Sequence, residues 1–171
     1  KLGVIEYFKD RAATFLMGGA AANTFLKIKG ADIGKSLIDD VADDYAALTQ
    51  AVKYPNLILP IDWREEKNAI LDIGPKSEKL FAGRISKAKT IIWSGPMGNA
   101  ERKKFASGNN TVARAIASNK GAVKIAGGGE TVMFLRDKGL DKKFTFISTG
   151  GSAMLDYLAG EKLPGILALD H

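Results

Sequence analysis

The chain has 171 residues, a formal net charge of +6 and 46% hydrophobic residues, which is typical of one globular domain. It has no cysteine, which excludes disulfides and thiolate metal sites, and its single histidine is His171, which excludes a histidine-dependent triad or a multi-histidine metal site.

No apolar run reaches the ~20 residues that a membrane span needs. The segment Lys1 to Glu6 has no signal-peptide pattern. We therefore expect a cytoplasmic protein without a membrane partner. It also lacks an initiator methionine, so we expect the chain to begin inside a longer protein. Basic residues are spread along the sequence without interleaved aromatic residues, so we expect no nucleic acid partner. The positive charge fits either a lysine-rich surface or an anionic ligand.

Apolar spacing predicts alternating helices and strands. In chain order we expect a helix near 2–12, a strand at 14–17, helices at 20–29 and 39–53, a strand at 57–59, a small strand excursion within 61–74, a helix at 75–87, a strand at 90–93, a helix at 111–118, a strand at 122–126, a helix at 130–138, a strand at 144–147, a helix at 151–159 and a closing turn at 163–166. This order predicts a single α/β domain over 1–171. We expect five core strands in a doubly wound, mainly parallel sheet with helices on both faces, a Rossmann-like three-layer sandwich.

Four of the predicted strands end in glycine-containing turns. The turns are Gly18-Gly19, Ser94 to Gly98, Gly127 to Gly129, and Ser148 to Gly151. A helix that begins after such a turn presents free N–H groups and a positive dipole end, which attract phosphates. Parallel strands would bring all four turns to one edge of the sheet, where open α/β folds bind ligands. The fingerprint G-x-G-x-x-G is absent from these turns, which weakens the alternative of a nicotinamide-binding enzyme.

Polar side chains lie within or just after three of these turns. Glu130 and Thr131 begin a predicted helix, where a carboxylate either caps the helix or holds Mg²⁺ on a phosphate ligand. Ser148 and Thr149 either cap the next helix or hydrogen-bond a phosphoryl group. Glu101 either accepts hydrogen bonds from ribose hydroxyls or is an ordinary surface residue.

Together these segments resemble the C-terminal, nucleotide-binding domain of phosphoglycerate kinase over essentially the whole chain. The matching motifs are Gly18-Gly19-Ala20-Ala21-Ala22-Asn23-Thr24-Phe25-Leu26-Lys27, Ile33-Gly34-Lys35-Ser36-Leu37, Leu71-Asp72-Ile73-Gly74-Pro75, Trp93-Ser94-Gly95-Pro96-Met97-Gly98, Gly127-Gly128-Gly129-Glu130-Thr131, Ser148-Thr149-Gly150-Gly151 and Leu163-Pro164-Gly165-Ile166. The first six of these motifs, in the right order, are highly specific, and the seventh matches the closing segment of the family.

The resemblance implies reversible phosphoryl transfer between 1,3-bisphosphoglycerate and MgADP, with Mg²⁺ and ADP or ATP bound by this domain. It assigns nucleotide binding to Gly18, Gly19, Leu37, Leu71, Ser94, Pro96, Gly98, Glu101, Gly127, Gly128, Gly129, Glu130 and Thr131, with Glu130 as the metal ligand. It places Lys1, Gly129, Gly150 and Gly151 near the transferring phosphate, although Lys1 is alternatively a frayed terminal residue. It also implies a monomer whose partner is an N-terminal domain that binds 3-phosphoglycerate and that this chain lacks.

The sequence departs from the family pattern at several of these positions. Glu130 replaces the usual aspartate, Ser94 replaces an asparagine, Ile70 stands where many members have glycine, Asn99-Ala100 replaces an apolar pair, and Ala20 replaces a third glycine. We expect a half-enzyme that binds nucleotide without turnover. The alternative is an inactive nucleotide-binding or regulatory module derived from the same family.

Overall fold

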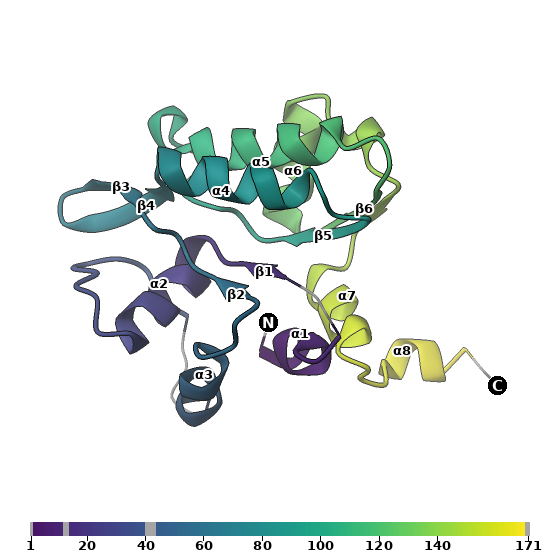
Figure 1. Ribbon diagram of the computed structural model, residues 1–171. Helices are drawn as coiled ribbons and strands as arrows, with labels where there is room; N and C mark the ends of the chain where they lie inside the picture. Colours follow the sequence, from purple (N-terminus) through teal and green to yellow (C-terminus); the bar gives the residue numbers. More distant parts are fainter. Residues whose placement is uncertain (1, 12–13, 40–43, 170–171) are drawn as a thin grey trace.

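The computed structural model describes residues 2–11, 14–39 and 44–169. Five parallel strands form its central layer: β1 (Phe15–Leu16), β2 (Leu57–Ile58), β5 (Thr90–Ser94), β6 (Val123–Gly127) and β7 (Phe146–Ser148). The expected α/β fold with five core strands is confirmed (Figure 1). No described helix is long and apolar enough to cross a membrane.

The hydrogen-bond ladders join these strands in two separate groups. β1 pairs with β2, with Phe15 opposite Leu57, while β6 lies between β5 and β7, with Trp93 opposite Ala126. No ladder joins β1 to β5 within the described residues. One continuous sheet was expected, so this break is a difference from the sequence prediction.

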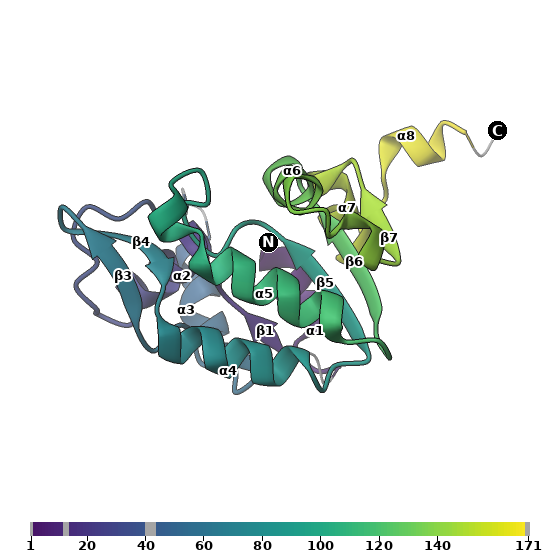
Figure 2. The same cartoon turned by 90° about the horizontal axis from the view of Figure 1, so that it is seen from above.

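Helices cover both faces of the strand layer. On one face lie α4 (Pro75–Ile85), α5 (Ser107–Ser118) and α6 (Gly129–Asp137); on the other lie α1 (Leu2–Phe8), α2 (Gly19–Ile28), α3 (Tyr45–Ala51) and α7 (Gly151–Leu158) (Figure 1). Figure 2 shows the first face from above, with α4 and α5 running side by side. The three-layer arrangement agrees with the sequence prediction.

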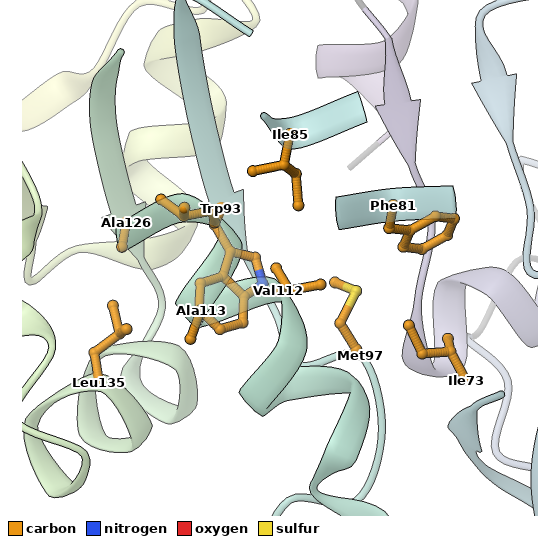
Figure 3. Close-up of a cluster of buried hydrophobic side chains, with 10 residues drawn as sticks. Ile73, Phe81, Ile85, Trp93, Met97, Val112, Ala113, Ala126 and Leu135 are labelled. Atoms are coloured by element: carbon orange, nitrogen blue, oxygen red, sulfur yellow. The ribbon is translucent and has the colours of Figure 1, made fainter. Parts of the chain in front are cut away.

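Each face has its own apolar core. Under α4, α5 and α6, Trp93 lies among Met97, Val112 and Ala126, all of which are less than 10% exposed (Figure 3). On the other face, Phe25 is 2% exposed and packs in a cluster that joins α1, α2 and α3 to β1 and β2. Burial of these side chains is the main stabilising contribution to the fold, at about 1.5–3 kcal/mol for each large residue.

Residues 61–74 form an antiparallel hairpin, β3 (Trp63–Glu66) and β4 (Ala69–Ile73), where a single small strand excursion was expected. Its two-residue turn is Lys67-Asn68, and both residues have positive φ, 51° and 62°. This is the backbone of a type I′ turn, whose twist matches that of the flanking strands. The hairpin projects at one end of the molecule (Figure 2).

Several boundaries differ from the prediction. α5 begins at Ser107, four residues before the expected start, and the expected closing turn at 163–166 is a short helix, α8 (Pro164–Leu167). The helix expected at 39–53 is described only as α3, because residues 40–43 lie outside the described ranges. Asp39 is not helical; its backbone N–H donates to Oγ1 of Thr24 at 3.0 Å.

Candidate functional site

A cleft of about 510 Å³ opens beside the carboxyl ends of the parallel strands. Its lining comes from the start of α2, from the β3–β4 hairpin, from the segment after β5 and from α6. The lining residues include Gly18, Gly19, Leu37, Asp39, Trp63, Ile70, Leu71, Asp72, Pro96, Gly98, Asn99, Glu101, Asn109, Glu130, Thr131, Met133, Phe134 and Asp137. A cleft at this edge is where open α/β sheets bind ligands.

The first glycine turn packs backbone against backbone with the segment after β5. The N–H of Gly19 donates to the carbonyl of Met97 at 3.0 Å, and Gly19 has a φ of +57°. A Cβ at Gly18 would stand 2.7 Å from Sδ of Met97, and one at Gly19 would stand 2.8 Å from the carbonyl of Pro96. Both glycines are therefore required for this close approach, which forms one wall of the cleft.

Asp72 holds the floor of the cleft together. Its side chain is fully buried, and its carboxylate accepts hydrogen bonds from the N–H groups of Gly108 and Ile73, each at 2.9 Å. Nη1 of Arg64 lies 3.6 Å away. Burial raises the pKa of Asp72 to about 6, although these hydrogen bonds and the Arg64 charge favour the ionised form. Asp72 thus connects β4 to the start of α5 directly beneath Gly98, where an added Cβ would lie 2.5 Å from its Oδ1.

The segment after β5 is held by further contacts with the hairpin and with α5. The N–H of Asn99 donates to the carbonyl of Leu71 at 2.7 Å, and Oδ1 of Asn109 accepts from the N–H of Met97 at 2.6 Å. Glu66 at the hairpin end forms ion pairs with both Arg102 and Lys104. These contacts fix the backbone on both sides of Glu101, which lines the cleft.

One face of α6 forms the opposite wall. Four side chains of α6 line the cleft: Glu130, Met133, Phe134 and Asp137. They follow the i, i+3, i+4, i+7 spacing of one helical face. Next to them, Thr131 is 2% exposed and its Oγ1 accepts from the N–H of Gly95 at 3.0 Å. The hydroxyl of Thr131 is therefore engaged in joining α6 to the segment after β5, while Glu130 remains exposed at the cleft.

The third and fourth glycine turns contact each other beside the cleft. Gly128 precedes α6 with a φ of +92°, and a Cβ at Gly151 would stand 2.6 Å from its Cα. Gly127 is covered by Met154 of α7, whose Sδ would lie 2.7 Å from an added Cβ. The two turns therefore form one packed unit, as neighbouring parallel strands β6 and β7 require.

The structure brings together most of the residues that the sequence singled out. Gly18, Gly19, Leu37, Leu71, Pro96, Gly98, Glu101, Glu130 and Thr131 all line the cleft. Another six of these residues lie outside that lining, at or shortly after the ends of β5, β6 and β7: Ser94, Gly127, Gly128, Gly129, Gly150 and Gly151. Lys1 lies outside the described residues. The functional roles assigned to these residues stay predictions.

Sequence reasoning missed other lining residues, chiefly Trp63, Met133, Phe134, Asp137 and Asn109. For α6 a signal was present, because helical spacing from Glu130 places 133, 134 and 137 on the same face. Trp63 carried no such signal, since its position depends on the β3–β4 hairpin, which was not predicted in full.

The cleft is acidic although the chain has a net charge of +6. Its lining includes five acidic residues: Asp39, Asp72, Glu101, Glu130 and Asp137. No Lys or Arg among the described residues lines it. No group of three or more acidic or histidine side chains gathers as a metal site within the described ranges. A single exposed carboxylate such as that of Glu130 is compatible with the way Mg²⁺ is commonly bound, through one or two carboxylates with the remaining ligands from phosphates and water.

The fold and the cleft define the class of protein: an open α/β protein with a cleft at the carboxyl ends of its parallel strands, beside glycine turns. The family model of phosphoglycerate kinase matches residues 1–161. The chain belongs to the phosphoglycerate kinase family.

Curated relatives and solved structures agree with this assignment. The chain is 40% identical to the phosphoglycerate kinase of Dictyoglomus turgidum and 42% identical to that of Macrococcus caseolyticus, over 99% of its length in both cases. It superimposes on the phosphoglycerate kinase of Coxiella burnetii with a TM-score of 0.85 and 32% identity, and on that of Pyrococcus horikoshii with 0.82 and 31%. The chain spans about half the length of these relatives: 48% of the Dictyoglomus turgidum protein and 49% of the Coxiella burnetii chain.

Proposed function

We propose that this chain is the nucleotide-binding, C-terminal half of a phosphoglycerate kinase and that its cleft binds MgADP and MgATP. In the complete protein, this half would take part in reversible phosphoryl transfer between 1,3-bisphosphoglycerate and ADP. The observation that carries the proposal is the cleft itself, formed where the family motifs at 18–19, 71, 96–101 and 130–131 come together.

The charges of the cleft support binding of a metal complex. A diphosphate that enters beside several carboxylates is repelled, and no described cationic side chain lines the cleft to offset this. Mg²⁺ bound to the phosphates and to Glu130 would convert that repulsion into attraction. The free N–H groups at the start of α6, after Gly128, would add hydrogen bonds to phosphate oxygens.

The apolar surfaces support a planar base on the other side of the cleft. Gly18 and Gly19 expose backbone rather than side chains, and Leu37 and Leu71 lie nearby in the lining. Glu101 is held at the rim between two fixed backbone segments and can accept hydrogen bonds from ribose hydroxyls. Ile70 also lines the cleft, and its side chain would narrow the space for the base.

Titration calorimetry with MgADP tests nucleotide binding. We expect saturable heat with Mg²⁺ and much weaker binding when EDTA removes the metal. Glu130→Gln should lose most of the metal-dependent affinity, whereas Glu161→Gln, an exposed glutamate beyond α7 and outside the cleft, should bind like the parent chain. Absence of heat and of any thermal shift at millimolar MgADP would refute the proposal.

Turnover requires the other substrate to be held in place. We propose that the second half of the enzyme, the N-terminal domain that binds 3-phosphoglycerate, is needed for this, and that closure of the two halves excludes water. Catalysis would then rest on positioning and charge stabilisation rather than on a covalent residue. Co-expression with the N-terminal half of the Dictyoglomus turgidum relative tests this: kinase activity in the mixture, and in neither half alone, is the expected result.

A second candidate, an inactive nucleotide-binding module, is favoured by the departures at Ser94 and Ile70. Under that function MgADP binds as before, but the mixture of halves stays inactive. Replacing Ile70 and Ser94 by the family's glycine and asparagine separates the two. Activity gained only in the replaced chain supports the inactive module, and activity in both supports the half-enzyme.

A further inference from the structure

The end of the β3–β4 hairpin contacts two segments that line the cleft. On one side, the N–H of Lys35 donates to the carbonyl of Asn68 at 2.6 Å, two residues before Leu37, which lines the cleft. On the other side, Glu66 forms ion pairs with the segment that carries Glu101, which is also in the lining. The hairpin end therefore holds both segments in place without itself entering the cleft.

Glu66 stands at the centre of a charged cluster on the second side. Its Oε2 is paired with Arg102 and its Oε1 with Lys104, so each carboxylate oxygen has its own cation. Both cations also lie over the ring of Phe105, with Cζ of Arg102 and Nζ of Lys104 each 4.9 Å from the ring centroid. Phe105 is 4% exposed and ends a short 3-10 helix, η1 (Lys103–Phe105). The two cations are therefore held between a buried aromatic ring and one carboxylate.

Glu66 is suited to remain charged while it holds these cations. Hydrogen bonds from Lys104 and Arg102 lower the pKa of Glu66, so its carboxylate is ionised at neutral pH. The side chain of Glu66 is 26% exposed, against 46% for Arg102 and 57% for Lys104, so Glu66 is the most shielded member of the cluster. Both cations are thus neutralised by a carboxylate that comes from the hairpin rather than from their own segment.

Glu101 directly precedes this cluster and takes no part in it. Its side chain is exposed and lines the cleft, and within the described ranges its carboxylate has no hydrogen-bond or ion-pair partner. The backbone next to it is fixed, because the N–H of Arg102 donates to the carbonyl of Asn99 at 3.2 Å. An unpaired carboxylate attracts any free ammonium group nearby, and Lys104 is only three residues away. By holding Lys104, Glu66 removes the nearest competitor for the Glu101 carboxylate.

We propose that Glu66 is a positioning residue for sugar recognition, because its hold on Arg102 and Lys104 leaves the carboxylate of Glu101 free at the cleft for the ribose hydroxyls of the nucleotide. The proposal rests on the function proposed for the cleft. A carboxylate that accepts hydrogen bonds from two neighbouring hydroxyls separates a ribonucleotide from its dideoxy counterpart, since the dideoxy sugar leaves it without those bonds. Selectivity for the ribose form therefore depends on a hairpin residue outside the cleft lining.

Titration calorimetry with two nucleotides tests the proposal: MgADP and the magnesium complex of 2′,3′-dideoxyadenosine diphosphate. The measured quantity is the ratio of the two Kd values in the parent chain, in Glu66→Gln, in Glu101→Gln and in the double variant. Glu65→Gln is the matched control, because Glu65 is an exposed neighbour on the same hairpin that lies outside the cleft lining and forms no ion pair with the described residues. The Tm of each variant separates effects on binding from effects on folding.

We expect the parent chain and Glu65→Gln to prefer MgADP about tenfold, which is typical of a hydrogen bond to a charged group. Glu66→Gln should lower this preference about threefold, through weaker binding of MgADP and not of the dideoxy nucleotide. In Glu101→Gln the further substitution at Glu66 should not change the preference.

Three results overturn the proposal: Glu66→Gln keeps the preference of the parent chain, it weakens both nucleotides equally, or its effect persists without the carboxylate of Glu101. Equal binding of the two nucleotides by the parent chain also overturns it, while MgADP binding and hence the proposed function stand. If MgADP does not bind the parent chain at all, the proposed function itself fails and this proposal fails with it.

Discussion

The two walls of the cleft differ in how firmly they are held. The floor and the first wall, around Gly18, Gly98 and Asp72, consist of close backbone contacts and a buried carboxylate with fixed partners. The α6 wall presents exposed side chains, and Met133 is 58% exposed. Substitutions on the first wall should therefore mainly change folding, whereas substitutions on the second should mainly change ligand binding.

Gly98→Ala should have the largest effect on the free energy of unfolding. A Cβ there would lie 2.5 Å from the carbonyl of Leu71 and 2.6 Å from Cα of Asp72, so backbone segments must separate. We expect a loss of about 3 kcal/mol in the free energy of unfolding, measured by urea denaturation, which is the upper end of typical overpacking costs. Gly83→Ala in α4 is the matched control, because nothing lies within 4 Å of its Cβ.

The control should gain about 0.5–1 kcal/mol, because alanine is favoured over glycine inside a helix. If Gly98→Ala is as stable as the parent chain, the floor of the cleft is not the rigid wall that these contacts indicate.

Asp72→Asn should have the second largest effect on the free energy of unfolding, and this effect should depend on pH. Because the folded-state pKa is about 6 and the ordinary pKa of an aspartate is 3.8, the folded state binds the proton more tightly than the unfolded state does. The free energy of unfolding should therefore decrease, through Asp72, as pH rises from about 4 to 6. Above about pH 6 the Asp72 contribution should not change further. The asparagine variant lacks this component and should be destabilised by about 1–3 kcal/mol at pH 5, since its amide N–H₂ replaces one acceptor in a buried network.

The difference between the unfolding free energies of the parent and Asp72→Asn, measured from pH 4 to 7, isolates this contribution. Other carboxylates are common to both chains and cancel. A difference that stays constant across this range contradicts the raised pKa of Asp72.

The pKa of Asp62 is lowered, in contrast to the raised pKa of Asp72. Burial raises its pKa, but hydrogen bonds from Oγ of Ser77 and from the N–H groups of Lys76 and Ser77, at 2.7, 2.9 and 2.7 Å, outweigh it and lower the pKa. Gly74 precedes α4 and has no side chain, so Asp62 caps the helix from the hairpin. Asp62→Ala should cost about 1–2 kcal/mol at pH 7 in urea denaturation.

The contribution of Asp62 is present above the ordinary aspartate pKa of 3.8 and is lost as pH falls through the lower folded-state pKa. Asp62→Ala should therefore approach the stability of the parent chain once the pH has fallen through that lowered folded-state pKa. An equal loss at neutral pH and under these acidic conditions would assign the effect to packing rather than to the charged cap.

Local patterns account for the strands, the helices and the four glycine turns, because each depends on spacing within a few residues. The burial of Asp72 and the contact of Gly128 with Gly151 depend on segments distant in the sequence, and no local pattern encodes them. The β3–β4 hairpin escaped full prediction because Lys67 occupies a positive-φ position without glycine. The break between β1 and β5 is visible only once the strand order is known.

Met133→Ala should have the smallest effect on stability and a clear effect on binding. The side chain is mostly exposed, so the free energy of unfolding should change by no more than about 0.5 kcal/mol. If the α6 wall contacts nucleotide, loss of this apolar surface should weaken MgADP binding about fivefold, or about 1 kcal/mol, in calorimetry. Leu167→Ala on α8, also largely exposed and outside the cleft, should leave affinity unchanged. Equal affinity of the two variants would confine the ligand to the first wall and leave α6 to act through Glu130 alone.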